Sequence, residues 1–375
     1  MDHVQLLADL VSINSINPDL VPGAPGETEI ARYVAAWMER SGMEVVIDEA
    51  APGRPSVVGI VRGSGGGRSL MLNAHMDTVG VAGMEDAHKP RVESKRLYGR
   101  GAFDMKGSLC AILLAAERAR SLNLRGDVIV TAVCDEEFAS IGTASVLKRF
   151  RADAAIVTEP TALDLCVAHK GFIWFEVESH GIAAHGSKPD LGVDAIVNMG
   201  PVLSGIRDLD LRLRSVSRHP LLGSGSIHAS LISGGQELSS YPERCRLSIE
   251  RRTVPGETVA EAESQIREIL AAASDRNRAK FEFRTTLSRE PFEVDQHAPV
   301  VSMLRSHIAR HRGSEPRIYG DTPWMDSALT SAAGILTVVF GPGGGGAHAV
   351  VEWSNLDEVA AAIDILTAFI TEFCA

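Results

Sequence analysis

Residues 128–138 read VIVTAVCDEEF and contain the transition that decides the fold, an apolar, β-prone run followed at once by three acidic side chains. The run is typical of a buried strand, and Asp135, Glu136 and Glu137 come where that strand ends. Adjacent carboxylates at the end of a buried strand concentrate negative charge where solvation is poorest. We therefore expect another group to compensate their charge.

Helical and strand-like segments alternate on both sides of this stretch. The apolar spacing predicts helices at 28–41, 107–121, 141–150 and 298–312 and after Asn355, and strands at 68–74, 128–134, within 152–160 and at 335–340. Strands separated by helices predict an α/β layer with a mostly parallel sheet.

The pattern changes between residues 171 and 288, where four segments alternate apolar and polar residues as half-exposed strands do. They are GFIWFEVESHG (171–181), SIHASLISGG (226–235), CRLSIERRTV (245–254) and AKFEFRTTL (279–287), with helices predicted at 190–207 and 257–274. This composition predicts an α+β domain with a four-stranded antiparallel sheet and two helices. We expect it as residues 171–288, inserted into a discontinuous α/β domain formed by residues 1–170 and 289–375.

The composition of the chain limits the kinds of partner and the cellular compartment that we expect. A chain of 375 residues with 45% hydrophobic residues fits a folded protein of two domains. The formal net charge of -11 argues against nucleic acid or an anionic membrane as the main partner. The amino terminus lacks a secretory pattern, no long apolar run occurs, and the 5 cysteines form no C-x-x-C pair. We therefore expect a cytoplasmic protein with reduced thiols.

Histidine and acidic residues recur where other predicted strands and turns end. His75 and Asp77 lie in LMLNAHMDTV (70–79), Asp104 in GRGAFDMKG (99–107), Glu159 in IVTEP (156–160) and His348 in GPGGGGAHAV (341–350). Taken singly, each has an ordinary interpretation, such as a structural histidine, a turn aspartate or a solvated helix start. Because the carboxyl ends of parallel strands form one crevice, the loops can converge, and metal binding explains all of them together.

The types of ligand constrain the metal. Imidazole and carboxylate without thiolate suit zinc, with cobalt or manganese as substitutes. If Asp104, Glu137 and Glu159 are ionised, two divalent ions leave one positive charge, which a hydroxide would match. Five ligands with one bridging carboxylate give three to each ion, the layout of a two-metal hydrolase.

The ordered set HMD, GRGAFDMKG, DEE, TEP and GAH resembles the motifs of the M20 family of co-catalytic zinc metallopeptidases and deacylases, over essentially the whole chain. That family includes acetylornithine deacetylase, succinyl-diaminopimelate desuccinylase and glutamate carboxypeptidase. The resemblance implies two zinc ions, one bound by His75 and Glu159 and the other by His348 and Glu137. Asp104 would bridge the two.

The resemblance also implies roles beside the metals. Asp77 would orient the His75 imidazole and raise its basicity. Glu136 would be the general base, taking a proton from water and delivering it to the leaving amine. The peptide bond from Asp104 to Met105 would be cis, as in similar members.

Two segments of the inserted domain resemble the family's lid and dimerisation signatures. In SHGIAAHGSKPDLGVDAI (179–196), His185 matches a histidine that stabilises the oxyanion from the partner subunit, and its ordinary alternative is a surface histidine. In ERRTVPGE (250–257), Arg252 matches an arginine that grips a substrate carboxylate. A homodimer, with His185 acting across the interface, is therefore expected.

Three positions depart from the family pattern. Ser239, in GGQELSSYP, stands where many relatives have an asparagine that contacts substrate. Glu250 replaces the aspartate of the Arg252 motif. Trp324, in DTPWMDSAL, places a large aromatic ring in a pocket-lining region, where it would restrict or stack on the acyl group or side chain.

The leading hypothesis is a zinc-dependent hydrolase that cleaves the amide bond of an N-acyl amino acid. The alternative within the same chemistry is a metallo-exopeptidase, a carboxypeptidase or dipeptidase, acting on small peptides. A nucleotide-dependent oxidoreductase would require a G-x-G-x-x-G turn after the first strand, which the sequence lacks. A metal-bearing but catalytically silent protein is disfavoured by the complete set of ligands and base.

Overall fold

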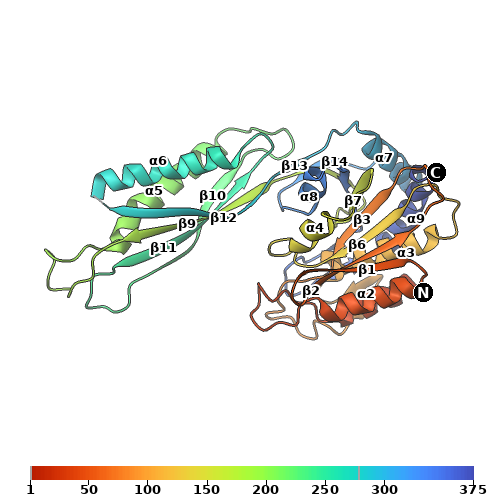
Figure 1. The fold of residues 1–375 in the computed structure, drawn as a ribbon, viewed down its shortest axis with the longest axis horizontal. Helices are drawn as coiled ribbons and strands as arrows, with labels where there is room; N and C mark the ends of the chain where they lie inside the picture. The colour runs from red at the N-terminus through yellow and green to blue at the C-terminus, as the bar shows by residue number, and fades with distance from the viewer. Residues whose placement is uncertain (1, 278) are drawn as a thin grey trace. The chain divides into compact units, whose positions relative to one another are not determined.

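The computed structural model describes residues 2–277 and 279–375, and the chain divides into two compact units. Unit 1 runs to Val167 and continues over Val294–Tyr319 and Met325–Ala375. Unit 2 comprises Ala168–Glu293 and Gly320–Trp324. Figure 1 shows the course of the chain through both units.

Unit 1 is built on a mixed sheet whose centre is parallel. Its strands run in the order β1-β2-β6-β3-β7-β15-β8. They are β1 (Glu44–Ala51), β2 (Arg54–Val61), β6 (Val128–Val133), β3 (Leu70–His75), β7 (Ala154–Val157), β15 (Leu336–Val339) and β8 (Leu165–His169). β3 pairs in parallel with β6 and β7, and β7 pairs in parallel with β15. The predicted α/β layer with a mostly parallel sheet is confirmed, whereas the antiparallel hairpin β1-β2 was not expected.

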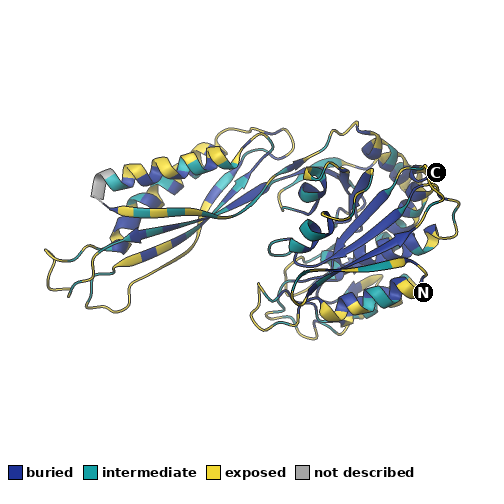
Figure 2. Cartoon of the chain, viewed as in Figure 1, coloured by how far each residue is buried: buried dark blue, intermediate teal, exposed yellow. Residues whose placement is uncertain are grey.

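Helices cover both faces of this sheet. One face packs on α1 (His3–Ser12), α2 (Thr28–Arg40), α3 (Gly107–Ala119), α7 (Pro299–Arg312) and α9 (Leu356–Phe373), and the other on α4 (Ile141–Val146) and α8 (Ser327–Ala332). The strands alternate accordingly, since Leu70 and Leu72 enter the first core and Met71 enters the second. Figure 2 shows the central strands buried on both faces. This is why they read as continuous apolar runs.

Short elements complete unit 1 and its connections. They are β4 (Arg91–Glu93), β5 (Arg96–Tyr98), β16 (Gly344–Gly345) and β17 (Trp353–Asn355), which form a small sheet, the single-turn η1 (Ala102–Lys106), β13 (Phe292–Glu293) and β14 (Ile318–Asp321). Among the described residues, no helix combines the length and apolar character needed to cross a bilayer.

Unit 2 has its own sheet and core. Its strands run in the order β10-β11-β9-β12, and every pair is antiparallel. They are β9 (Gly171–His180), β10 (Ser226–Gly234), β11 (Arg244–Thr253) and β12 (Lys280–Arg289), with α5 (Ala195–Arg214) and α6 (Val259–Asn277) packed on one face. The predicted four-stranded sheet with two helices is therefore confirmed.

Capping explains where the two helices of unit 2 begin. α5 begins at Ala195, not at 190, because the Asp194 side chain accepts hydrogen bonds from the N–H groups of Ile196 and Val197. α6 begins after Thr258, whose N–H donates to Glu261 while its hydroxyl accepts from the Glu261 N–H. This reciprocal pair is a capping box.

Candidate metal centre

The carboxyl edge of the parallel strands gathers the predicted ligands of unit 1. His75 is the last residue of β3, Glu136 and Glu137 follow β6, and Glu159 follows β7. Because these strands are parallel neighbours, their ends meet at one edge of the sheet. Asp104 reaches the same place from η1, and His348 from the loop between β16 and β17.

Two groups of three ligands share Asp104. In the first, His75 Nε2 lies 3.2 Å from Asp104 Oδ1 and 3.9 Å from Glu159 Oε1. In the second, His348 Nε2 lies 3.5 Å from Asp104 Oδ2 and 3.1 Å from Glu137 Oε2. Each oxygen of the Asp104 carboxylate therefore faces a different histidine. The structure brings all five predicted ligands together.

The residues of both groups fit divalent cations. Within each group the candidate ligand atoms lie within 4.8 Å of one another. Glu137 Oε1 is buried and, within the described part of the chain, has no hydrogen-bond partner. A buried carboxylate oxygen without a donor is costly, and a metal ion would satisfy it. The set of imidazole and carboxylate groups matches the preferences of zinc and related ions.

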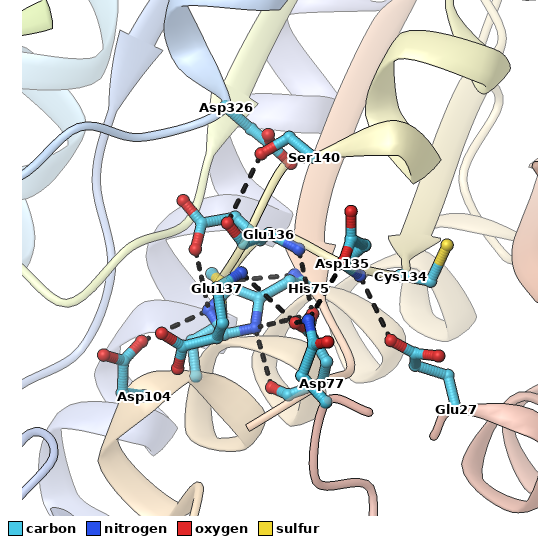
Figure 3. A network of polar contacts seen from close by, with 12 residues as sticks. Glu27, His75, Asp77, Asp104, Cys134, Asp135, Glu136, Glu137, Ser140 and Asp326 are labelled. Carbon is cyan, nitrogen blue, oxygen red and sulfur yellow. Dashed lines mark hydrogen bonds and ion pairs between the residues drawn. The ribbon is translucent and has the colours of Figure 1, made fainter. Parts of the chain in front are cut away.

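Asp77 holds both the histidine ring and the loop after β6 (Figure 3). The Nδ1 of His75 is 2.9 Å from the backbone oxygen of Asp77, which can only accept, so the proton lies on Nδ1. Nε2 is therefore the ring nitrogen that faces Asp104 and Glu159, where a metal ion would replace the proton that this nitrogen carries in the metal-free protein. The Asp77 carboxylate accepts hydrogen bonds from the N–H groups of Glu136 (3.1 Å) and Glu137 (3.2 Å).

Glu136 lies at the site without belonging to either group of ligands. Its Oε2 is 3.9 Å from His75 Nε2, and its side chain is largely buried. Burial raises the pKa of Glu136 well above its usual range, and the neighbouring Glu159 carboxylate raises it further. A buried carboxyl group with a perturbed pKa beside both groups of ligands is a candidate for proton transfer at this site.

The pKa values of the ligands report an excess of negative charge. Burial, with Asp104 close by, raises the pKa of Glu137 to about 7. Hydrogen bonds to Asp104 and Glu137 raise the pKa of His348 to about 10. In the absence of metal, protons are therefore the cations that this cluster retains.

A buried network behind the site was not found from the sequence. Arg54 donates to Glu27 through two bonds of 2.8 Å and to Asp135 Oδ1 at 2.7 Å. Asn17 Nδ2 donates to Asp77 Oδ2 (2.8 Å) and to Asp135 Oδ1 (3.0 Å). The sequence indicates no role for Asp135. In the structure its hydrogen bonds to Arg54 and Asn17 anchor the loop that carries Glu136 and Glu137. No motif or periodicity marks these residues.

Asp326 is a further buried carboxyl group in unit 1. It accepts a hydrogen bond from the Thr143 hydroxyl at 2.5 Å. Burial raises its pKa to about 6, and it adds to the negative potential at Glu136 and Glu159. The peptide bond between Asp104 and Met105 is cis, as the resemblance implied.

The remaining predicted site residues lie in unit 2. His185 and Ser239 are neighbours, because the Gly186 N–H donates to the backbone oxygen of Ser239 at 2.6 Å. His185 is exposed, with its Nδ1 2.8 Å from the Ser187 hydroxyl.

Arg252 lies near the carboxyl end of β11, whereas Ser239 lies in the loop that leads into the amino end of that strand. Its Nε donates to Glu250 Oε1 at 2.7 Å, and its guanidinium carbon is 5.3 Å from the centre of the Phe172 ring. The side chain is 32% exposed, and within the described residues neither of its two terminal nitrogens forms a hydrogen bond or an ion pair. That outer edge of the guanidinium is the one that binds a carboxylate with two parallel bonds.

Comparisons with known proteins find relatives that are similar over almost the whole chain. The chain is 27% identical over 408 residues to N-formyl-4-amino-5-aminomethyl-2-methylpyrimidine deformylase from Bacillus subtilis, covering 99% of this chain and 94% of that protein. It is 31% identical over 360 residues to acetylornithine deacetylase from Myxococcus xanthus, covering 91% of each. The solved structure of a tripeptidase from Staphylococcus aureus superposes with a TM-score of 0.81 at 19% identity, covering 99% of this chain and 98% of that one.

The family model described as peptidase family M20/M25/M40 matches residues 71–372. This range contains the predicted metal ligands and all of unit 2. The chain therefore belongs to the M20/M25/M40 family of peptidases and is a hydrolase of amide bonds.

Proposed function

We propose that this protein is a binuclear zinc hydrolase that releases an amino acid from its N-acyl derivative. The observation that carries the proposal is the Asp104 carboxylate, which presents one oxygen to each of two groups of histidine and glutamate. Cobalt or manganese would substitute for zinc, because the ligands are imidazole and carboxylate alone.

The residues around the centre have separable tasks. Two zinc ions would supply Lewis acidity to the scissile carbonyl and to the attacking water. Glu136, which lies beside His75 without belonging to either group of ligands, takes the proton from that water and passes it to the leaving amine. Asp77 keeps the His75 ring in the tautomer that presents Nε2 to the centre.

Arg252 supports an amino-acid product with a free carboxylate. Its Nε is held by Glu250, so the outer edge of the guanidinium is oriented for a carboxylate. The C-terminal carboxylate of a small peptide would fit the same edge, which keeps an exopeptidase as the alternative. The relatives named as a deformylase and a deacetylase favour the deacylase. Ser239 would contribute a shorter polar contact to substrate than the asparagine common in relatives.

The geometry of unit 2 supports a homodimer in which His185 serves the partner's site. Arg252 pairs with Phe172 at one end of the sheet, whereas Arg244 pairs with His180 at the end that leads to His185. Eight residues of strand separate the two ends by roughly 26 Å, at about 3.3 Å for each residue. One small substrate cannot contact both side chains of the same chain. If both act on one substrate, His185 comes from a second copy.

The edge strand β10 supports the same conclusion. It is one of the two outer strands of the sheet in unit 2, and it leaves Leu231 and Ile232 exposed. Leu238, in the loop that follows, is fully exposed. An edge strand with exposed apolar side chains favours association with another chain.

The proposal is tested by hydrolysis of a panel of substrates. N-acetyl, N-succinyl and N-formyl amino acids and a set of dipeptides are incubated with zinc-loaded and cobalt-loaded protein, and the released amine is measured. We expect turnover of N-acyl amino acids that chelation abolishes and added zinc restores. Turnover that survives complete removal of metal would contradict the proposal, and exclusive turnover of dipeptides would establish the alternative.

A further inference from the structure

Glu352 is a buried carboxylate surrounded by donors from the segment that carries Asp104. Its side chain is 2% exposed. Oε1 accepts from the N–H groups of Phe103 (2.9 Å) and Asp104 (3.0 Å). Oε2 accepts from the Gly101 N–H (3.1 Å) and from Arg100 Nη1 (2.6 Å). Four donors thus converge on one side chain, and three of them are backbone groups of residues 101–104.

The partner of Glu352 reaches the loop that carries His348. Arg100 is also 2% exposed, and its Nη2 donates to the backbone oxygen of Ala349 at 3.0 Å. The Gly99 N–H donates to the backbone oxygen of Glu352 at 3.1 Å. The pair therefore ties the turn before Asp104 to the residue that follows His348.

This arrangement exceeds what a structural ion pair requires. Unit 2 contains a comparable buried pair, in which Arg251 donates to Glu257 at 2.9 Å. Glu257 accepts from a single backbone group, the Val254 N–H at 3.1 Å. Glu352 instead accepts hydrogen bonds from the backbone N–H groups of Gly101, Phe103 and Asp104, so it fixes the backbone that carries Asp104. The two oxygens of Asp104 face two different groups of ligands.

We propose that Glu352 is a positioning residue for both metals, acting through the backbone of Asp104 and, with Arg100, through the loop of His348. The proposal rests on the two-metal site proposed above. Residues that orient metal ligands typically contribute about 10-fold to 100-fold to metal affinity. Because Asp104 belongs to both groups of ligands, loss of its support should weaken both ions together.

Replacement by glutamine tests the proposal with little change of shape. In Glu352→Gln one oxygen becomes an NH₂ group, which would face either Arg100 Nη1 and the Gly101 N–H or the N–H groups of Phe103 and Asp104. In both orientations donor meets donor, so two hydrogen bonds are lost. Glu257→Gln is the matched control. It removes the negative charge of a glutamate that pairs with a buried arginine, and Glu257 is remote in sequence from every proposed metal ligand.

Cobalt binding to the metal-free protein is followed by calorimetry and by visible absorption. We expect two cobalt ions per wild-type chain, an affinity for both that falls about 10-fold to 100-fold in Glu352→Gln, and unchanged affinity in Glu257→Gln. Wild-type affinity in a folded Glu352→Gln protein would overturn the proposal. Failure of the wild type to bind two ions would instead overturn the two-metal site, so the two results are distinguishable.

Arg100→Lys provides the decisive variant if Glu352→Gln does not fold. It keeps the positive charge beside Glu352 but cannot also reach the backbone oxygen of Ala349 with a second fixed nitrogen. We expect folded protein by circular dichroism with weaker cobalt binding in the group that contains His348. Two ions bound as tightly as in the wild type would overturn the proposal.

Discussion

The two sheets of this protein differ in the side chains that neutralise their acidic residues. On the exposed face of the unit 2 sheet, Glu176 lies 2.7 Å from Arg284 and Glu178 lies 3.1 Å from Arg246. At the carboxyl edge of the unit 1 sheet, Asp104, Glu137 and Glu159 meet only histidines. Within the described residues, no arginine or lysine forms an ion pair with them.

The difference shows what decides whether a cluster of carboxylates needs an external cation. Pairs on a solvated strand face are compensated by their neighbours and contribute little to stability. Buried carboxylates whose partners are only histidines remain ionised at low cost only if those histidines keep their protons or a metal ion takes the place of the protons. If the proposed two-metal site is correct, bound metal balances the charge of the unit 1 cluster, whereas arginine side chains balance that of unit 2.

The largest expected effect comes from replacing Glu136, and replacing the adjacent Glu137 should have a different consequence. Glu136→Gln should lower kcat by roughly 10²-fold to 10⁴-fold, the usual contribution of a general base, and keep its metal. Glu137→Gln should lose metal from the group that contains His348. Steady-state kinetics and elemental analysis of both proteins measure these effects. A Glu136→Gln protein with wild-type turnover would disprove the assigned role.

The next effect tests the proposed role of His185 in the site of a partner subunit. His185→Ala should lower kcat by roughly 10²-fold to 10³-fold, as expected for loss of an oxyanion donor. Mixing it with Glu136→Gln protein and letting subunits exchange should restore about a quarter of wild-type activity, because half of the dimers are mixed and each then has one complete site. If His185 acts within its own chain, mixing restores nothing.

A smaller effect is expected at Arg252. Arg252→Lys keeps the charge but loses the planar edge that binds a carboxylate with two bonds. We expect kcat/KM to fall roughly tenfold, mainly through KM, for substrates with a free carboxylate, and to change little for the corresponding amides. An equal loss for both types of substrate would argue against carboxylate binding.

The stabilisation by zinc should depend on pH. Without metal, the pKa of Glu137 is raised from 4.5 to about 7 and that of His348 from 6.5 to about 10. In both cases folding favours the protonated form, so the stability that these groups contribute is lost as pH rises through those values. Zinc replaces the protons. The increase in Tm on adding zinc should therefore be larger at pH 8 than at pH 6, and a smaller increase at pH 8 would contradict this.

The smallest effect is expected in the control region. Glu176→Gln removes the acidic partner of Arg284 and Arg246 on the exposed face of the unit 2 sheet, and it should change the free energy of unfolding by less than about 1 kcal/mol. Urea denaturation of the zinc-loaded protein measures this change. Loss of bound zinc in this variant would remove the contrast between the two sheets.

The sequence predicts the positions that depend on topology. Glu136, Glu137 and Glu159 follow apolar runs that are typical of strands. Because the carboxyl ends of parallel strands share one edge of a sheet, the sequence alone predicts that these three side chains lie close together. Asp104 and His348 join this set by residue type and by their places in loops, whereas the division of the five ligands between two ions rests on the resemblance to a known family.

Other parts of the site depend on contacts that leave no local pattern. Arg54 is the first residue of β2, which belongs to the β1-β2 hairpin that the sequence did not predict. Its partners Glu27 and Asp135 lie 27 and 81 positions away. Glu352 likewise contacts Asp104 across 248 positions. No periodicity links residues so far apart, and each alone resembles an ordinary surface charge.

Metal stoichiometry tests the dependence of unit 1 on external cations most directly. Protein stripped of metal is titrated with zinc by calorimetry, and bound zinc is counted after dialysis. We expect two zinc ions per chain in the wild type and in Glu136→Gln, and fewer in Glu137→Gln. A single ion in the wild type, or two ions retained in Glu137→Gln, would contradict the account.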